Sequence, residues 1–343
     1  MTTVIQPSGT PTVTKRDLAE AAMRRSWFPV ARSADLANPQ QATLLGTNLV
    51  VFRRSDGTAT VLPSRCPHRG GSFTIGTQHG DDIACSYHGW RFSGVSGKCT
   101  YIPSLPDQSK IPPKAGVKVY PAIERYGHVW TCLEDPVTEM YDLAEWRDLD
   151  LEWLAATPLN SPTGVAVAIE NFRDVAHFPF VHRDTMGDVP EVVEPLNVRR
   201  DGLHVWMDRE LLATEGEWNN GGDQTMRYHC VAPGLAAITF TSSTLGTRVV
   251  AGFPSPIAYD QVKIFWGVAN EVGYRGSTLG ESLELEQRVY LEDLPIAERI
   301  EPREVPWDNE TEEFSAPADL FTLNYRRAFT DLMGRLEQPS PTV

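Results

Sequence analysis

Short apolar runs with partial alternation, separated by glycine-rich turns, fill the first third of the chain. The pattern predicts a helix over residues 16–25 and then a series of strands, two of which the turn S-D-G-T joins into a hairpin. The strands are W-F-P-V-A (27–31), L-L-G-T-N-L-V-V-F-R-R (44–54), A-T-V-L (59–62), R-F-S (91–93) and short runs up to V-W-T-C-L (129–133). We therefore expect a small antiparallel β domain over residues 26–136. It ends at Asp135-Pro136, because the residue before a proline is pushed out of helical geometry.

After residue 136 the pattern changes to longer strands flanked by helices. The expected strands include A-V-A-I-E (166–170), H-V-W-M-D-R-E-L-L (204–212), M-R-Y-H-C-V (226–231), A-A-I-T-F-T (236–241) and V-K-I-F-W-G-V-A (262–269). Residues 315–336 fit a helix that Ser315 caps, with Pro317 in its first turn. Its apolar face is formed by Phe321, Tyr325, Phe329, Leu332 and Leu336. Strands between helices predict an antiparallel sheet packed on helices over residues 137–343, so the expected fold class is α+β.

Composition and charge exclude several classes of protein. The chain has 343 residues, enough for two domains, and its 41% hydrophobic and 22% charged residues are ordinary for a globular protein. A net charge of −14 and the lack of a Lys/Arg run argue against a nucleic-acid partner. No apolar stretch approaches the length that spans a bilayer, so we expect no membrane contact. Residues 1–25 lack a secretory signal pattern and are expected to form a flexible tail and a helix.

Two Cys–His pairs stand close together in the first domain. Cys66 and His68 form C-P-H, and after 16 intervening residues Cys85 and His88 form C-S-Y-H. Two thiolates and two imidazoles suit a [2Fe–2S] cluster in which the cysteines hold one iron and the histidines hold the other. Such a centre stores one electron at roughly −150 to +300 mV. Zinc is the alternative, but zinc fingers usually place two Cys in the first pair and two His in the second.

The residues around these pairs carry a family resemblance. The segments S-R-C-P-H-R-G-G and C-S-Y-H-G-W-R-F resemble the Rieske motif of ring-hydroxylating and demethylating non-haem iron oxygenases. Rieske subunits of respiratory complexes have an extra cysteine in each loop, whereas Gly70 or Gly71 and Ser86 or Tyr87 stand at those places here. A Rieske ferredoxin needs only about 100 residues, so the remaining two-thirds of the chain favours the oxygenase branch.

A second chemical pattern opens the larger domain. His177 and His182 lie five residues apart, about 140° around an ideal helix, and would not share a face. Pro179 lies between them and clashes with the carbonyl of Val175, so the helix must bend or stop, which can bring His182 back toward His177. Two imidazoles and one carboxylate with open positions form the facial triad of mononuclear Fe(II) oxygenases.

The segment around these histidines is similar to the catalytic motif of Rieske oxygenase α-subunits. It reads N-x-x-D-x-x-H-x4-H, with Asn171, Asp174, His177 and His182 in the matching places. The resemblance implies that Asp293, in R-V-Y-L-E-D-L-P-I-A-E, is the third iron ligand, although the adjacent Glu292 is an alternative.

The same resemblance gives Asp174 a bridging role. It implies that the carboxylate accepts a hydrogen bond from a cluster-ligating histidine, His68 or His88, of a neighbouring subunit. A head-to-tail ring, and thus a homotrimer, follows, because a heterologous interface closes by rotation.

These features together predict a terminal oxygenase. It would use O2 and electrons to hydroxylate or oxidatively demethylate a small aromatic or heterocyclic substrate, with one [2Fe–2S] cluster and one mononuclear Fe(II) per subunit. The resemblance is greatest, in outline, to the vanillate, phthalate and dicamba group. Ring cis-dihydroxylation is an alternative, and so is a Rieske electron-transfer protein without oxygenase activity. The aromatic and histidine residues Tyr228, His229, Phe240 and Trp266 lie on expected strands and are either pocket or core residues.

The expected partners follow from what the chain lacks. No G-x-G-x-x-G follows a strand, so a separate ferredoxin or flavin reductase must supply the electrons. Basic residues near the cluster loops are candidate contacts for an acidic carrier: Arg65, Arg69, Arg91 and Lys98. Cys99, Cys132 and Cys230 are left over from the metal sites, and reduced thiols in a cytoplasmic protein are the expectation.

Overall fold

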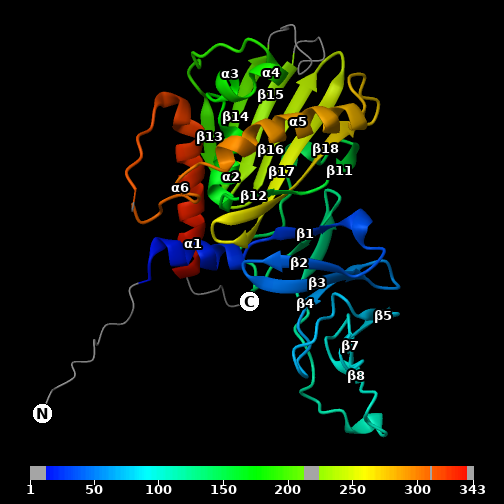
Figure 1. Ribbon diagram of the computed structural model, residues 1–343. Coiled ribbons are helices and arrows are strands. Elements are labelled where there is room, and N and C mark those ends of the chain that lie inside the picture. Colours follow the sequence, from blue (N-terminus) through cyan, green and yellow to red (C-terminus); the bar gives the residue numbers. More distant parts are fainter. Residues whose placement is uncertain (1–12, 212–223, 310, 338–343) are drawn as a thin grey trace, which may run out of the picture.

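The computed structural model describes residues 13–211, 224–309 and 311–337. The chain forms an elongated molecule with a large antiparallel sheet at one end and small sheets at the other (Figure 1). This arrangement confirms the expected α+β class. The flexible tail expected before residue 13 and Leu212 of one expected strand lie outside the described residues.

The N-terminal part begins with helix α1 (Lys15–Arg24), as expected. Thr14 caps it through a hydrogen bond from the Asp17 amide, while the Asp17 carboxylate accepts from the Thr14 amide. Three small antiparallel sheets follow. They are formed by β1 (Phe28–Arg32), β10 (His128–Thr131) and β9 (Ala122–Arg125); by β2 (Gln40–Leu44), β3 (Thr47–Arg53) and β4 (Ala59–Pro63); and by β5 (Thr77–His79), β6 (Asp82–Ala84), β7 (Arg91–Ser93) and β8 (Cys99–Tyr101).

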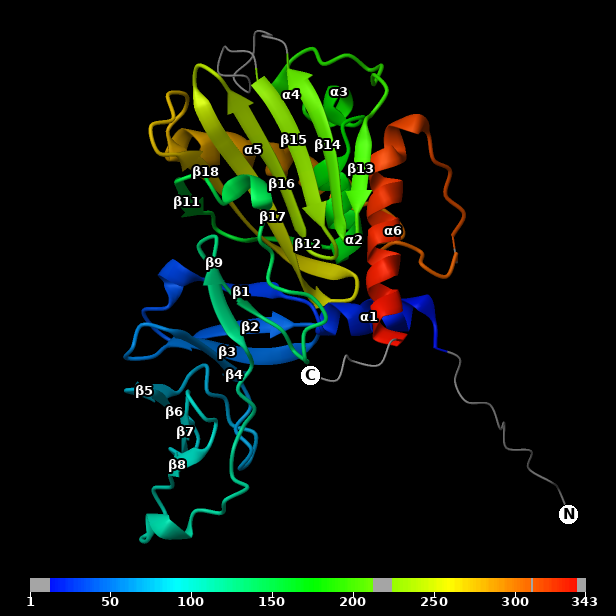
Figure 2. The ribbon, with the colours of Figure 1, turned by 180° about the vertical axis from the view of Figure 1, so that it is seen from behind.

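The large sheet has eight antiparallel strands, one of which pairs off its main path. Its order is β11 (Leu151–Ala155), β18 (Gln261–Glu271), β17 (Gly246–Ala258), β16 (Leu235–Ser242), β15 (Gln224–Val231), β14 (His204–Leu211) and β13 (Val198–Asp201), with β12 (Leu159–Ser161) paired to β18. Helices α2 (Val165–Arg173), α3 (Phe178–Val181), α4 (Arg183–Met186) and α5 (Leu279–Ala297) cover one face, as the front and back views show (Figure 2). Helix α6 (Leu320–Gly334) stands beside β13 and β14.

One expected strand is a helix. Residues 166–170 belong to α2, which packs on β16, β17 and α6. Val165, Ala166, Val167 and Ile169 are all buried, so this segment meets neighbours around most of its circumference. Helix and strand are told apart in a sequence by the spacing of polar residues between apolar ones, with a period of 3.6 for a helix and 2 for a strand. A run that is buried on all sides lacks such polar positions, so its sequence does not distinguish the two.

The C-terminal helix begins later than expected. Ser315 does not cap it: a 3₁₀ turn at Pro317–Asp319 comes first, and α6 starts at Leu320. The expected apolar face is confirmed, because Phe321, Tyr325, Phe329 and Leu332 are buried. Leu336, just past the helix, packs partly buried against the same core.

Apart from a minor cluster of Ala156, Trp266 and Tyr290, two apolar clusters hold the molecule together. A small one surrounds Cys66 and Cys85 and includes Phe52, Phe73 and Phe92. The other runs through the large sheet and its helices and also takes in residues of α1, β1 and β10. Residues on both sides of position 136 thus share one core, and the domain boundary there stays a prediction. No helix of the described ranges has the length and apolar character needed to span a membrane.

Candidate metal centres and their surroundings

Two loops with the same backbone pattern carry the first donor set. In one, the Cys66 carbonyl accepts from the Gly70 amide (3.0 Å) and the Cys66 amide donates to the Gly71 carbonyl (2.8 Å). In the other, the Cys85 carbonyl accepts from Gly89 (3.0 Å) and the Cys85 amide donates to Trp90 (2.8 Å). Gly70 and Gly89 have φ of 77° and 69°, a left-handed conformation that glycine adopts without steric cost. Each loop therefore curls back on its cysteine and presents the nearby histidine.

The side chains of these loops converge as two inner thiols and two outer imidazoles. Cys66 and Cys85 are buried, whereas His68 is half-buried and His88 is exposed. The two imidazole centroids lie 4.8 Å apart, and the His68 ring stacks on Trp90 at 4.4 Å. A side chain at position 71 would meet Cys85 Sγ, since a Cβ there would lie 2.7 Å from the sulfur. The set fits a [2Fe–2S] cluster whose irons have unlike ligands.

The protonation of Cys66 supports the need for a cation. Burial, together with the neighbouring Cys85, raises the pKa of this thiol to about 11. Without a metal Cys66 stays a neutral thiol at neutral pH, and all described cysteines are free. A bound cation would replace the protons and stabilise the thiolates.

The second donor set lies where α2 gives way to two one-turn helices. Helix α2 already ends at Arg173, and Asp174 has extended backbone angles. His177 and His182 then flank α3 at its two ends, with Pro179 in its first turn. The sequence correctly predicted that the two histidines meet, but the reason was wrong. The helix does not bend at Pro179; it stops before His177, and a new single turn brings the rings together.

Three electron-rich atoms converge at this point. His177 Nε2 and His182 Nε2 lie 3.0 Å apart, and Asp293 Oδ1 lies 3.6 Å and 3.3 Å from them. Asp293 comes from α5, far away in sequence. All three ligand atoms lie within 4.8 Å of one another, as a metal site requires. The arrangement is the two-His, one-carboxylate facial set.

Carboxylates behind the two rings set their orientation. Asp174 Oδ2 faces His177 Nδ1 at 2.9 Å, and Glu292 Oε2 faces His182 Nδ1 at 2.8 Å. If each Nδ1 carries the proton it shares with its carboxylate, both Nε2 lone pairs point at the same space. Asn171 also donates to Asp293 Oδ1 at 3.3 Å. Glu292 thus contacts the far side of His182, and Asp293 faces the centre.

The pKa shifts of Asp174 and His182 show that the site favours positive charge. Burial opposes ionisation of Asp174, but hydrogen bonds from the His177 ring and the Ala176 amide outweigh it and lower its pKa. Burial alone would lower the pKa of His182, yet Asp293 and Glu292 outweigh burial and raise it. The site therefore draws positive charge, which a divalent cation supplies in place of a proton.

Two cavities meet beside this triad. They enclose about 630 Å³ and about 440 Å³ of empty space, their open mouths included. Four residues line both cavities: Asn171, Phe172, Tyr290 and Asp293. Sequence reasoning missed Phe172 and Tyr290, although Tyr290 lies three residues before Asp293 and so shares its helix face. The strand residues Tyr228, His229, Phe240 and Trp266 line neither cavity and are core residues.

The fold and the two donor sets define a class of protein. It is an oxygenase component with a loop pair for an iron–sulfur cluster and a separate triad for a single iron. The sequence matches the Rieske [2Fe-2S] domain over residues 26–121. It also matches the vanillate O-demethylase oxygenase C-terminal domain over residues 163–335, just over half of the chain. The chain therefore belongs to the Rieske non-haem iron oxygenases, as an oxygenase component.

Individual relatives agree with this assignment. Methylxanthine N1-demethylase NdmA of Pseudomonas putida is 28% identical over 327 residues, which is 90% of this chain and 89% of the relative. A structure of P. putida NdmA with caffeine has a TM-score of 0.79 at 23% identity, covering 95% of this chain and 98% of the other. Dicamba monooxygenase bound to dicamba has a TM-score of 0.74 at 18% identity, covering 92% and 98%. These two structures show the same fold.

Family membership confirms three expectations. The chain is an oxidoreductase, and it carries a [2Fe–2S] cluster together with a mononuclear iron. It acts with O2 and with a separate reductase.

Proposed function

We propose that Cys66, His68, Cys85 and His88 hold the cluster and that His177, His182 and Asp293 hold the iron. The observation that carries the second assignment is the convergence of two Nε2 atoms and one carboxylate oxygen, with both Nδ1 atoms occupied by other carboxylates. Glu292 orients His182 from behind and is not a ligand in this proposal. When bound, the iron supplies the reductive activation of O2.

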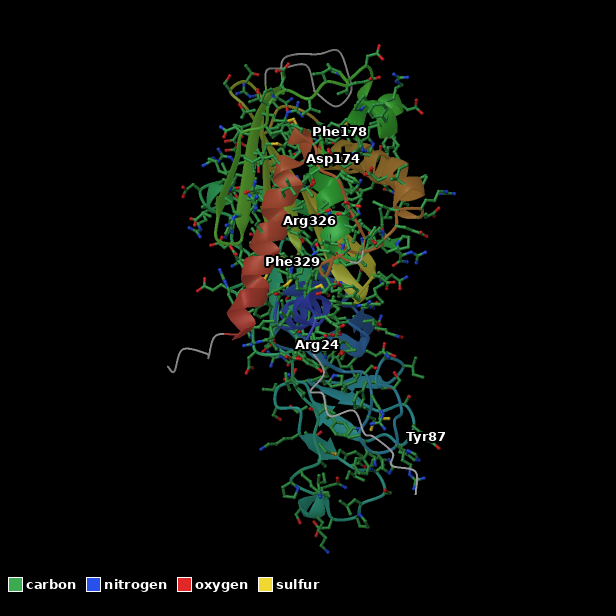
Figure 3. The ribbon with its side chains drawn as sticks, turned by 90° about the vertical axis from the view of Figure 1, so that its left-hand side faces the viewer. Arg24, Tyr87, Asp174, Phe178, Arg326 and Phe329 are labelled. Carbon is green, nitrogen blue, oxygen red and sulfur yellow. The ribbon has the colours of Figure 1, made fainter. Side chains whose placement is uncertain are left out.

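Electron transfer in this proposal runs between subunits. Tyr87, next to His88, lies at the opposite end of the molecule from Asp174 (Figure 3). His88 is exposed, and the Asp174 side chain, 31% exposed, opens into a surface hollow lined also by Glu170, Val181 and Arg326. A neighbour's His68 or His88 can donate to Asp174, whose Oδ2 already faces His177. Repetition of this contact head to tail closes a ring, which we propose to be a homotrimer.

The reaction we favour is monooxygenation or oxidative demethylation of a small aromatic or heterocyclic compound. The support is the similarity over nine-tenths of the chain to a methylxanthine demethylase, together with the fold of dicamba monooxygenase. Ring cis-dihydroxylation is the second candidate, because a 3-chlorobenzoate-3,4-dioxygenase oxygenase subunit is 34% identical over 170 residues, 47% of this chain. An electron carrier without oxygenase activity would have no use for the triad or for the cavities beside it.

Docking of the reductase and location in the cell are parts of the same proposal. Arg65, Arg69 and Lys98 are exposed near the cluster loops and offer positive charge to an acidic carrier on a chain of net charge −14. Transfer that did not slow as ionic strength rose would contradict this contact. The described cysteines are all free thiols, which supports a cytoplasmic location.

Product analysis tests the function. The purified protein, with O2 and a surrogate reductase, is incubated with methoxylated, N-methylated and unsubstituted aromatic and heterocyclic compounds. We expect formaldehyde and a demethylated product, or a monohydroxylated product, from at least one compound. Asp293→Ala should abolish the product and keep the red-brown colour of the cluster. A cis-diol as the sole product would transfer the assignment to the second candidate, and product from the Asp293→Ala protein would contradict the iron site.

A further inference from the structure

The two cavities that share Phe172, Tyr290 and Asp293 differ from the hollow at Asp174, which Arg326 lines. None of the described residues that line them is a lysine or an arginine. Their charged residues are Asp293, in both, and Glu286, in the cavity that the histidines also line. A ligand carboxylate would leave water there without a guanidinium or ammonium partner, and such a transfer is unfavourable.

Two buried arginines lie behind the walls, and each has one hydrogen bond and two nitrogen atoms without a partner. Arg248 is fully buried and donates to Glu286 Oε1 at 2.9 Å. Arg173 stacks on the Phe172 ring at 4.3 Å and donates to the Ala237 carbonyl. Neither residue is among the described residues that line these two cavities.

Iron in the triad would not make the site attractive to anions. A divalent iron adds two positive charges, while Asp293, Glu292 and Asp174 contact the two histidines with three carboxylates. The net charge of the occupied centre is therefore not positive, and long-range attraction of a substrate carboxylate is absent.

One polar group in the shared wall has no partner. The Tyr290 side chain is 7% exposed, and its hydroxyl makes no hydrogen bond. Phe172 and Trp266 hold the ring, with centroids at 5.1 Å and 4.8 Å. Gly252 faces the hydroxyl so closely that a Cβ there would lie 2.6 Å from it. A buried hydroxyl costs free energy when it is left unpaired, so its persistence at a ligand cavity indicates a ligand atom as its partner.

We propose that the substrate is an uncharged aromatic compound with a hydrogen-bond acceptor, such as a carbonyl or ether oxygen, to which the Tyr290 hydroxyl donates. This inference rests on the proposed function, since it assigns the substrate class of the same site. Tyr290 lies one helical turn before Asp293 on α5, so a substrate held by its hydroxyl lies next to the iron position. The rings of Phe172 and Phe178 supply apolar walls for the aromatic part.

Three probes of nearly the same shape test the proposal. They are 2-acetylnaphthalene, which is neutral and has an acceptor, 2-naphthoate, which is anionic, and 2-isopropylnaphthalene, which has no acceptor. Dissociation constants are measured by equilibrium dialysis on the iron-loaded protein without O2, so that no turnover occurs. We expect 2-acetylnaphthalene to bind at least about tenfold more tightly than 2-naphthoate.

Matched phenylalanine variants isolate the hydroxyl. Tyr290→Phe should weaken binding of 2-acetylnaphthalene by about three- to thirtyfold and leave 2-isopropylnaphthalene unchanged. Tyr325→Phe is the control, since this hydroxyl donates to the Pro233 carbonyl at 2.7 Å and lines neither cavity. Tyr325→Phe should leave the dissociation constants of both 2-acetylnaphthalene and 2-isopropylnaphthalene unchanged.

Two results would overturn the proposal. One is equal or tighter binding of 2-naphthoate, and the other is unchanged binding of 2-acetylnaphthalene to the Tyr290→Phe protein. Iron content is measured in the same samples. If the iron and the cluster are intact when the probes contradict the proposal, the substrate class is wrong and the proposed function stands. If the wild-type protein holds no iron, the proposed function itself fails.

Discussion

At the scale of single residues, the choice between Glu292 and Asp293 depends on helix rotation. Adjacent positions on a helix point about 100° apart, so only one of the two carboxylates can face the space between the two Nε2 atoms. Packing of the Tyr290 ring against Phe172 and Trp266 sets that rotation. It places Asp293 on the open side of the rings and Glu292 behind His182.

Substitution of each carboxylate should separate their roles. Asp293→Ala should lose the iron, because a direct ligand is removed. Glu292→Gln should retain it with about 10- to 100-fold weaker affinity, because only the orientation of His182 is affected. Iron is measured by metal analysis after dialysis against graded chelator concentrations, with the visible spectrum of the cluster as an internal control. Equal iron loss in both variants would show that Glu292 is a ligand.

The sequence could predict the members of this site but not their arrangement. The resemblance pointed to His177, His182 and Asp293 as candidates, with Glu292 as the alternative to Asp293. The rotation of α5 is determined by contacts with β-strands and with α2, which no local pattern encodes. For the same reason the cavity residues Phe172 and Tyr290 were not identified.

His128 is a buried histidine that should make stability depend on pH. It is fully buried, its Nδ1 contacts the Tyr126 carbonyl at 2.7 Å, and its Nε2 has no partner. Burial lowers its pKa to about 4. Because the folded-state value lies below the unfolded value of about 6.5, this group stabilises the fold above pH 6.5, and the contribution is lost as the pH falls toward 4.

His128→Asn should flatten that dependence. The free energy of unfolding of the wild-type protein should fall by about 3 kcal/mol more than that of the variant between pH 6.5 and pH 4. Urea titrations at several pH values measure the difference between the two proteins. Both proteins contain the same metal centres, so the contribution of these centres cancels in that difference. Parallel pH profiles would show that His128 is not the acid-sensitive group.

At the scale of elements, α2 shows how tertiary packing overrides a local pattern. The segment A-V-A-I-E (166–170) suggested a strand, but it is covered by strands of the large sheet and by α6. The helix ends at Arg173, and this end positions Asn171 and Asp174 beside the triad. The order of strands along the large sheet was likewise not available from local alternation, because pairing depends on contacts distant in sequence.

The ion pair between α2 and α6 should stabilise this arrangement. Arg326 donates to both Glu170 oxygens, at 2.6 Å and 2.8 Å, and the Glu170 side chain is 13% exposed. Arg326→Leu leaves that carboxylate unpaired and should lower the free energy of unfolding by about 2 kcal/mol in urea titrations. Glu313→Gln removes the more exposed partner of the same arginine and should cost less than about 1 kcal/mol. If Arg326→Leu and Glu313→Gln lowered the free energy of unfolding equally, the ion pair between α2 and α6 would contribute no more to stability than the exposed pair.

At the scale of the whole molecule, the two donor sets lie at opposite ends of the elongated fold. The cluster loops lie in the small apolar cluster at one end, and the triad lies beside the large sheet at the other (Figures 1 and 3). Composition and motif content predicted two unlike iron sites and an α+β fold. They did not predict that α1, β1 and β10 share the core of the larger part. The account therefore depends on electrons reaching the iron from a neighbouring chain.

Mixed oligomers test this dependence directly. One chain carries Cys85→Ser and keeps a working iron site, and a second chain carries Asp293→Ala and keeps a working cluster. The two are coexpressed with different affinity tags and purified through both, and product is measured with a compound that the wild-type protein converts.

The account predicts recovery of activity in the mixture, although each variant alone makes no product. In a head-to-tail trimer of mixed composition, one contact in three joins a working cluster to a working iron, so activity should reach about a third of the wild-type value. Asp174→Asn placed on the Cys85→Ser chain should suppress the recovery, whereas the same change on the Asp293→Ala chain should not. Mixed oligomers that carry both metal centres yet make no product would contradict transfer between subunits.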